Sequence, residues 1–449
     1  MKYIPVTTEQ NDEIQKVLGF KNTEELMKKI TNEKFILTRN LNIEGPLSEI
    51  EITKKMSDIS SKNTALNEKI PFIGEIAYNH YIPSIVKHLA MQSQFYTSYT
   101  PYQPELSQGT LEAIYEYQSY MVNLTGMDVS NASLYDGATA AAEAMYMLTA
   151  ATDKCKVLIS SLIHPSVKEV LKTYAHTAEI GLIEVINDNG NISYPDLEEK
   201  LSDEIACFIF QSPNAFGVIE DISALVDILS KKRIKMISVI LEAMSLGIMK
   251  PPGTMGVDIV CGEAQSFGND ISFGGPGLGF ITCKKENIRR LPGRIVGKTL
   301  DTEGRVSYVL TLRAREQDIR REKATSNICT NNSLCALKAS IYLSTLGEEG
   351  LREVAEQNLQ LSHYAFNELN KISKINVPYK KPFFNEFLIE TPIEPEKLSK
   401  ILLEKGILIS NSPLSKFYPY LKNPLILTFT ELTTKNDIDY LVRTLKEVL

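Results

Sequence analysis

Several segments of this 449-residue sequence carry residues whose types and spacing suit the binding of an anionic ligand that contains a ring. The first is Gly137-Ala138-Thr139, at the start of an Ala-rich stretch that we expect to be helical. Free backbone N–H groups and the positive end of the helix dipole make such a start a ready anion site. The alternative is an ordinary helix cap, in which Asp136 or Thr139 bonds only to its own backbone.

Two further polar residues follow apolar, strand-like runs. Asn214 lies in "FQSPNAFGVIED", where Pro213 and Gly217 favour a turn and where the amide can also hydrogen-bond a ring substituent. Glu242 ends "VILE", and a carboxylate there can face a ring nitrogen and keep it protonated. The alternatives are turn formation alone for Asn214, and a rim carboxylate or a pair with an arginine for Glu242.

A fourth segment, "GEAQSFGNDISFGGPGLGF" (262–280), has a glycine-rich turn but no lysine. The stretch resembles the one in which enzymes that use pyridoxal phosphate carry their Schiff-base lysine. Gln265 and Ser266 stand where that lysine would lie, and the nearest lysines along the chain are Lys250 and Lys284. Only a primary amine condenses reversibly with an aldehyde cofactor. We therefore expect no catalytic residue of the chain's own at this position.

Alternating strands and helices must position these four segments. Between residues 105 and 280, near-continuous apolar runs such as "KVLISS", "IACFIFQS" and "IKMISVIL" alternate with helical patterns. This alternation predicts an α/β fold with a mostly parallel sheet covered on both faces. Ligands of such sheets bind beyond the C-terminal ends of the strands, where the four segments would meet.

Three regions are expected along the chain: an N-terminal helical arm (1–65), a large α/β domain (66–335) and a small α+β domain (336–449). The arm holds two helix-start patterns, Asn22 with Glu25 and Ser48 with Glu51. Residues 71–109 are dense in Gly, Pro and Tyr, and we interpret them as a long ordered loop.

Composition argues against several functional classes. The net charge of −7 disfavours nucleic acid or an anionic membrane as the main partner, and no apolar run is long enough to span a membrane. The N-terminus turns polar too early for a secretory signal, which favours a cytoplasmic location. The six cysteines form no CxxC pair and are expected to be buried, reduced thiols. The five histidines show no close ligand spacing, so no metal site is expected.

Four stretches spread through the chain carry a resemblance to pyridoxal phosphate (PLP) enzymes of the aspartate-aminotransferase fold. The chain is most similar to the N-terminal (alpha) subunits of the two-subunit glycine dehydrogenase (decarboxylating), the P protein of the glycine cleavage system. The resemblance covers essentially all of the sequence. The stretches are "YIPSIVKHLAMQSQFYTSYTPYQPELSQGTLEAIYEYQ", "SLYDGATAAAEAM", "GEAQSFGNDISFGGPGLGF" and "TLRAREQDIRREKATSNICTN".

This resemblance implies a function shared between two chains. The P protein binds PLP, releases CO2 from glycine and passes the aminomethyl group to the lipoyl arm of the H protein. In the two-subunit form, the companion subunit 2 carries the Schiff-base lysine and holds PLP covalently. The alpha subunit keeps the fold without that lysine, is expected to be inactive alone, and assembles with the companion into a heterotetramer. By this reading, Gly137, Ala138, Thr139, Asn214 and Glu242 form a vestigial cofactor pocket.

Other residues are expected to act at an interface, because active sites of this fold lie between subunits. Tyrosines of a Pro-rich loop can pack on a cofactor or donate a hydroxyl, and neighbouring polar residues can cap a helix or orient a partner's group. Plain interface packing, and a structural histidine, are the alternatives. The residues are Tyr96, Tyr99, Tyr102, Glu105, His80 and Tyr81.

An arginine-rich segment follows the glycine-rich turn. Arginines at this density suit carboxylate, phosphate or inter-subunit salt links, and a solvated basic face is the alternative. They are Arg313, Arg315, Arg320 and Arg321.

Two other functions stay open at this point. One is a scaffold or regulatory pseudoenzyme that binds a partner without completing an active site. The other is a self-sufficient PLP enzyme that uses Lys250 or Lys298 from an unexpected place.

Overall fold

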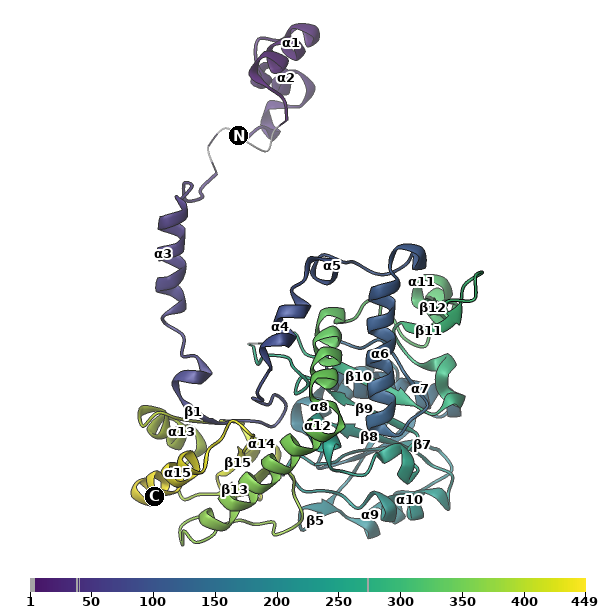
Figure 1. The fold of residues 1–449 in the computed structure, drawn as a ribbon, viewed down its shortest axis with the longest axis vertical. Coiled ribbons are helices and arrows are strands. Elements are labelled where there is room, and N and C mark those ends of the chain that lie inside the picture. The colour runs from purple at the N-terminus through teal and green to yellow at the C-terminus, as the bar shows by residue number, and fades with distance from the viewer. Residues whose placement is uncertain (1–4, 38, 40, 273) are drawn as a thin grey trace. The chain divides into compact units, whose positions relative to one another are not determined.

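The computed structural model describes residues 5–37, 39, 41–272 and 274–449 (Figure 1). The chain divides into two compact units, residues 1–64 and 65–449. All candidate site residues lie in the second unit.

The first unit consists of short helices. Both predicted helix starts are formed: the Asn22 side chain accepts the Glu25 N–H at 2.8 Å, and Ser48 and Glu51 form a capping box. None of the helical residues in this unit is buried, so its described helices build no core of their own. The helices are α1 (Thr8–Leu18), α2 (Thr23–Ile30) and α3 (Glu49–Ser60).

A seven-stranded sheet forms the centre of the second unit. Its strands run parallel except β10, which is antiparallel to both of its neighbours. The predicted mostly parallel sheet is therefore confirmed. The strand order is β2 (Val129–Ser130), β10 (Gly279–Cys283), β9 (Ile259–Glu263), β8 (Lys235–Ile240), β7 (Ile205–Gln211), β3 (Lys156–Ser160) and β4 (Gly181–Val185).

Helices cover both faces of this sheet, which explains why β7 is apolar along almost its whole length. Phe208 and Phe210 pack into one apolar cluster, whereas Cys207 and Ile209 pack into the other. The face of the sheet that carries Phe208 and Phe210 is covered by α6 (Gln108–Thr125), α9 (Tyr194–Lys200), α10 (Ile222–Ser230) and the first half of α12 (Ser333–Leu369). The face that carries Cys207 and Ile209 is covered by α7 (Gly137–Thr152) and α8 (Pro165–Thr177). As the sequence indicates, α12 is interrupted at Gly347, whose φ is 64°.

The C-terminal part packs around a third core. It includes Phe72, because β1 (Ile70–Phe72) pairs in parallel with β14 (Ile407–Ile409). The chain therefore starts this unit in the C-terminal core and then crosses to the large sheet. The other elements are the second half of α12, β13 (Glu386–Glu390), α13 (Pro395–Glu404), α14 (Leu414–Phe417), β15 (Pro424–Thr428) and α15 (Lys435–Val448).

Several elements do not follow from the sequence pattern, because they are short and lie in stretches dominated by turn-forming or charged residues. The expected loop 71–109 contains two short helices, and the charged stretch after the glycine-rich turn contains a β-hairpin and a further short helix. They are α4 (Ser84–Ala90), α5 (Ser93–Tyr96), β11 (Ile295–Leu300), β12 (Val306–Thr311) and α11 (Gln317–Arg320). A further hairpin of two-residue strands, β5 (Asn187–Asp188) and β6 (Asn191–Ile192), flanks the predicted Asn-Gly turn.

All six cysteines are free. Four are buried as expected, but Cys155 and Cys329 are exposed, because neither lies on a strand or helix face that packs into a core. In the described part of the chain, no helix combines the length and apolar character needed to cross a bilayer.

Candidate functional site

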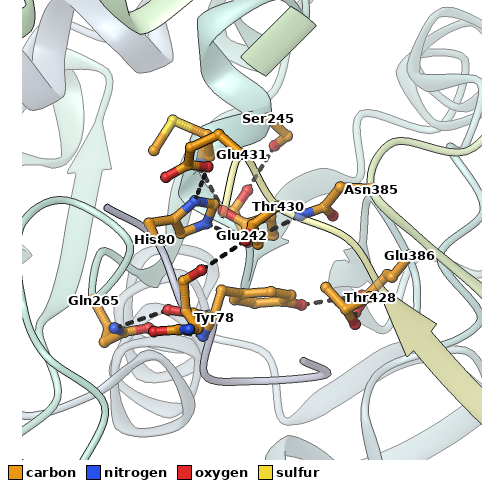
Figure 2. Close-up of polar contacts among 12 residues, drawn as sticks. Tyr78, His80, Glu242, Ser245, Gln265, Asn385, Glu386, Thr428, Thr430 and Glu431 are labelled. Atoms are coloured by element: carbon orange, nitrogen blue, oxygen red, sulfur yellow. Dashed lines mark hydrogen bonds and ion pairs between the residues drawn. The ribbon is translucent and has the colours of Figure 1, made fainter. Parts of the chain in front are cut away.

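One stretch of chain, residues 74–81, which we call the crossing segment, bonds to residues that follow the parallel strands, and Figure 2 shows its Tyr78 and His80 beside Gln265 and Glu242. The segment leaves β1 and meets side chains that follow three strands of the sheet. The Gln265 amide, after β9, accepts the Tyr78 N–H at 2.9 Å and donates to the Tyr78 carbonyl at 3.2 Å. Glu75 lies 3.4 Å from the His164 ring, after β3. The place where ligands of α/β sheets bind is therefore lined by this segment.

His80 is the centre of a buried ionic network in which both ring nitrogens have carboxylate partners (Figure 2). Its Nε2 lies 3.2 Å from Glu242, after β8, and its Nδ1 lies 2.9 Å from Glu431, after β15. Burial lowers the pKa of His80, but the two carboxylates outweigh it and raise the pKa to about 10. The ring is therefore a cation at neutral pH, and it links the large sheet to the C-terminal core.

The structure buries one of two neighbouring residues to which the sequence assigns the same interface role. Both His80 and Tyr81 are expected at a surface that meets a second chain. The structure instead buries His80, which is 6% exposed and fully used within its own chain, and leaves Tyr81 59% exposed. The reason is that the His80 ring is held between two carboxylates, whereas Tyr81 bonds to Glu431 through its backbone N–H.

Glu386 anchors the other end of the crossing segment. It accepts the Tyr78 hydroxyl at 3.0 Å, the Glu75 N–H at 3.1 Å and the Thr428 hydroxyl at 3.1 Å. Burial raises the pKa of Glu386 to about 7. Neither this glutamate nor Glu431 was singled out from the sequence, because nothing near them in the chain predicts a contact with residues some 300 positions away.

The predicted anion site at the start of α7 is formed, but the chain's own carboxylates use it. Asp136 caps the helix by accepting the Thr139 N–H at 2.8 Å. Glu263, the last residue of β9, accepts the N–H groups of Gly137 at 2.9 Å, Leu278 at 2.6 Å and Gln265 at 3.1 Å. Burial raises the pKa of Glu263 to about 7. Sequence analysis missed Glu263, although a glutamate at the end of an apolar strand was a usable signal.

Close packing at this helix start leaves little room. A Cβ added at Gly137 would meet the Glu263 backbone nitrogen at 2.8 Å. Ala138 and Thr139 follow in the first turn of α7 and are half-buried. The position therefore requires glycine, and its N–H points at the Glu263 carboxylate.

Gln265 occupies the place of the missing lysine in the sequence pattern, and its amide is held on several sides. Besides its bonds to Tyr78, it donates to the Asn269 carbonyl at 2.5 Å. The neighbouring Ser266 is buried, and its hydroxyl has no hydrogen-bond partner among the described residues. Lys250 and Lys298, the two lysines of the self-sufficient alternative, are exposed, one in a loop before a 3-10 turn and the other on β11.

Asn214 serves its own turn. Its amide nitrogen donates to Gly190 at 3.0 Å and to Glu220 at 2.7 Å, and its oxygen accepts the N–H groups of Phe216 and Val218. All four hydrogen-bonding positions of the side chain are used, so the turn-forming alternative describes this residue.

The predicted tyrosine loop, residues 95–109, contrasts with this buried network. Tyr99 is 88% exposed, and Tyr96, Tyr102 and Glu105 are also exposed. Together with the start of α12, the first part of the loop walls a cavity of about 220 Å³ that Arg294 also lines. The Tyr102 ring faces the guanidinium groups of Arg294 at 5.7 Å and Arg313 at 5.4 Å.

The four arginines of the basic segment do not form one cluster. Arg313 pairs with Asp318 at 3.5 Å, and the Arg315 guanidinium donates to the carbonyls of Leu291 and Gly293. Arg320 and Arg321 are exposed and form no ion pair with any described residue. Arg315 is therefore structural, whereas Arg320 and Arg321 remain accessible to a second molecule.

The residues around the strand ends do not fit PLP. An aldehyde cofactor needs an amine, and Gln265 supplies an amide. Its phosphate needs free N–H groups, and those of Gly137, Gln265 and Leu278 bond to Glu263. The described residues also hold no group of three or more His, Cys, Asp or Glu side chains arranged for a metal ion.

Comparison with known proteins now adds the family. The model of the glycine cleavage system P-protein matches residues 1–445. "Probable glycine dehydrogenase (decarboxylating) subunit 1" of Desulforamulus reducens is 46% identical over 441 residues, covering 98% of both chains. The protein of the same name from Moorella thermoacetica is 45% identical over the whole of both chains.

Solved structures agree with the sequence relatives. A crystal structure of glycine decarboxylase (P-protein) of the glycine cleavage system, in inhibitor-bound form, superposes with a TM-score of 0.91 at 36% identity and full coverage of both chains. A cysteine desulfurase from Thermococcus onnurineus shares the fold, with a TM-score of 0.64 at 17% identity, covering 87% of this chain and 97% of that one. The chain thus belongs to the glycine cleavage system P-protein family, with relatives named as subunit 1 of glycine dehydrogenase (decarboxylating).

Proposed function

We propose that this chain is the lysine-free subunit of a two-subunit P protein. With a companion subunit 2 it decarboxylates glycine and transfers the aminomethyl group to the lipoyl arm of an H protein. PLP, held covalently by the companion, supplies the electron sink for loss of CO2. The observation that carries the proposal is Gln265, an amide whose oxygen and nitrogen both bond to the backbone, at the lysine position of a chain related over nearly its whole length to subunit 1 proteins.

The tyrosine loop is the part of this chain that we assign to the companion's active site. Tyr96, Tyr99 and Tyr102 offer exposed rings and hydroxyl groups, with Glu105 and Tyr81 as further contributors. Exposed aromatic side chains favour contact with another molecule, since they bury large areas at little entropic cost. Arg320 and Arg321 would add salt links in a heterotetramer of two copies of each subunit, located in the cytoplasm.

A reconstitution experiment tests the division of labour. The chain, its companion and their mixture are each assayed for exchange of bicarbonate into the carboxyl group of glycine. We expect exchange from the mixture and none from this chain alone, because it has no amine for the cofactor. Exchange catalysed by the isolated chain would overturn the proposal and favour a self-sufficient enzyme.

Conservative changes in the tyrosine loop separate a contributed site from a scaffold. Tyr99→Phe with Tyr102→Phe removes two hydroxyl groups and keeps both rings, so assembly should persist. We expect kcat in the complex to fall about 10-fold or more, in line with the loss of oriented donors elsewhere. Tyr420→Phe, in another exposed tyrosine outside the loop, is the matched control. Normal turnover of the double variant would show that the chain acts only as a scaffold.

A further inference from the structure

The crossing segment is held by the C-terminal core at its start and by residues at the ends of the sheet strands along the rest of its length. Before it, β1 is paired with β14 and Phe72 is buried in the C-terminal core. Its first part presses on β15, because a Cβ added at Gly74 would lie 2.0 Å from the Thr428 hydroxyl oxygen. Beyond Gly74, its side chains and backbone reach the ends of β3, β8 and β9. The segment is therefore an inserted layer between the sheet and the C-terminal part.

Three features of the expected cofactor pocket meet protein groups instead of a ligand. Glu242, expected to face a protonated ring nitrogen, faces the His80 ring at 3.2 Å. The N–H of Gly137, expected to face a phosphate, faces the Glu263 carboxylate at 2.9 Å. The side chain at the lysine position, Gln265, bonds to the peptide groups of Tyr78.

The protein groups match the expected ligand groups in charge as well as in shape. A carboxylate at a helix start replaces one anion with another, and an imidazole ring beside Glu242 replaces one nitrogen heterocycle with another. Unpaired buried polar groups would be costly if the pocket were simply vacant, so a chain that gives up a cofactor gains stability by satisfying them internally.

We propose that the crossing segment, together with Glu263, is a built-in occupant of the cofactor pocket, in which His80, Glu263 and Gln265 take the places of the cofactor ring, its phosphate and the lysine. The chain then binds neither PLP nor inorganic phosphate there, whether or not a companion subunit is present. The inference rests on contacts within this chain and on the family resemblance that places the expected pocket, and not on the proposed division of labour between two subunits.

The first test restores the missing amine. The full-length Gln265→Lys variant is mixed with PLP, reduced with borohydride and mapped by peptide mass spectrometry, which separates residue 265 from surface lysines. We expect no pyridoxyl group on residue 265, because the Tyr78 backbone fills the space in front of it. A pyridoxyl group on that residue, above the level at exposed Lys250 and Lys298, would show a vacant pocket and overturn the proposal.

The second test removes the Glu263 carboxylate from the expected phosphate position. Wild type, Glu263→Ala and Glu143→Ala are melted with and without inorganic phosphate. Glu143 is the matched control, because it is another buried carboxylate, on α7 itself but away from its first turn. We expect phosphate to raise the Tm of Glu263→Ala alone, since only that variant exposes the N–H groups to an anion. A saturable phosphate effect on wild type, or none on a folded Glu263→Ala, would contradict the proposal.

A third variant keeps the second test decisive if Glu263→Ala does not fold. Glu263→Gln has the same size as the native residue and still fills the phosphate position. It should fold and show no response of Tm to phosphate. A response in this variant would mean that phosphate binds without displacing the side chain at residue 263, which would contradict the assignment of Glu263 as the occupant.

Discussion

The crossing segment and the tyrosine loop are separated along the chain by little more than the short helix α4, yet they use their side chains in opposite ways. In the crossing segment, Tyr78 and His80 are buried, and their polar atoms bond to residues of the same chain. In the loop, Tyr99 is 88% exposed. The side chains of one region are used within this chain, and those of the other are left accessible. The difference shows that tyrosines close together in the sequence can be buried as structure in one segment and exposed in the next.

The largest expected effect follows from removing the cation of the crossing segment. His80→Ala leaves Glu242 and Glu431 buried without their shared partner, and breaking a buried pair in this way typically costs about 3–5 kcal/mol. Urea unfolding measures the loss. His88→Ala, in an exposed histidine on α4, is the control and should stay within about 0.5 kcal/mol of wild type. Equal midpoints for the two variants would contradict a structural role for the network.

The pH dependence of stability tests whether the His80 ring is charged in the folded chain. The folded pKa of His80 is raised to about 10 from an ordinary 6.5, so the folded chain holds a proton that the unfolded chain loses in this window. The stabilisation is fully present below about pH 6.5 and is lost as the pH rises to about 10. The difference in unfolding free energy between wild type and His80→Gln should therefore shrink across that range. A constant difference would mean that the ring is not charged in the folded chain.

Glu386 gives a somewhat smaller effect in a lower pH window. Its folded pKa is about 7 against an ordinary 4.5, so the folded chain retains a proton that the unfolded chain releases. Stability then falls as the pH rises from about 4.5 to 7, by about 3 kcal/mol for this group alone. Glu386→Gln should flatten that part of the profile, measured by urea unfolding at several pH values. An unchanged slope would show that Glu386 is ionised throughout.

The smallest effect on the isolated chain is expected in the tyrosine loop. Tyr99→Ala should change the unfolding free energy by less than about 0.5 kcal/mol, because the side chain has little contact with its own chain. The same change should weaken association with the companion by about 1–2 kcal/mol if the ring is buried there. Calorimetric titration of the two subunits measures the second value. A large loss of stability in the isolated chain, or unchanged association, would remove the contrast between the two regions.

Much of the fold was predictable because its signals are local. The alternation of apolar strands and helices identified the parallel sheet, and Gly126 and Gly347 marked the end of α6 and the break in α12, both with positive φ. The caps at Asn22 and Ser48 formed as their spacing indicates. The hairpin of β11 and β12 was missed, because its strands are only partly buried and lie within a stretch that is charged as a whole.

In the candidate site too, the local features were predictable and the contacts between distant residues were not. The absence of an amine at residue 265 was visible in the sequence, as was a helix start suited to an anion. The role of Glu263 and the bonds of His80 to Glu242 and Glu431 were not, since these pairs lie up to 351 positions apart. Asn214 suited a ligand by type, but its neighbours in the fold use all of its hydrogen bonds. Arg315 also suited a ligand, but its two terminal nitrogens donate to the carbonyls of Leu291 and Gly293.

The sequence by itself thus determined the sheet, its helical cover and the lack of a lysine, because these depend on residue type and on spacing over a few turns or strands. Only the tertiary structure decided that the pocket is filled from within and that the tyrosines are left outside. A buried charge is tolerated only where partners converge on it, and here those partners come from the crossing segment, the ends of β8 and β9 and the chain after β15. Convergence of this kind is a property of the folded chain.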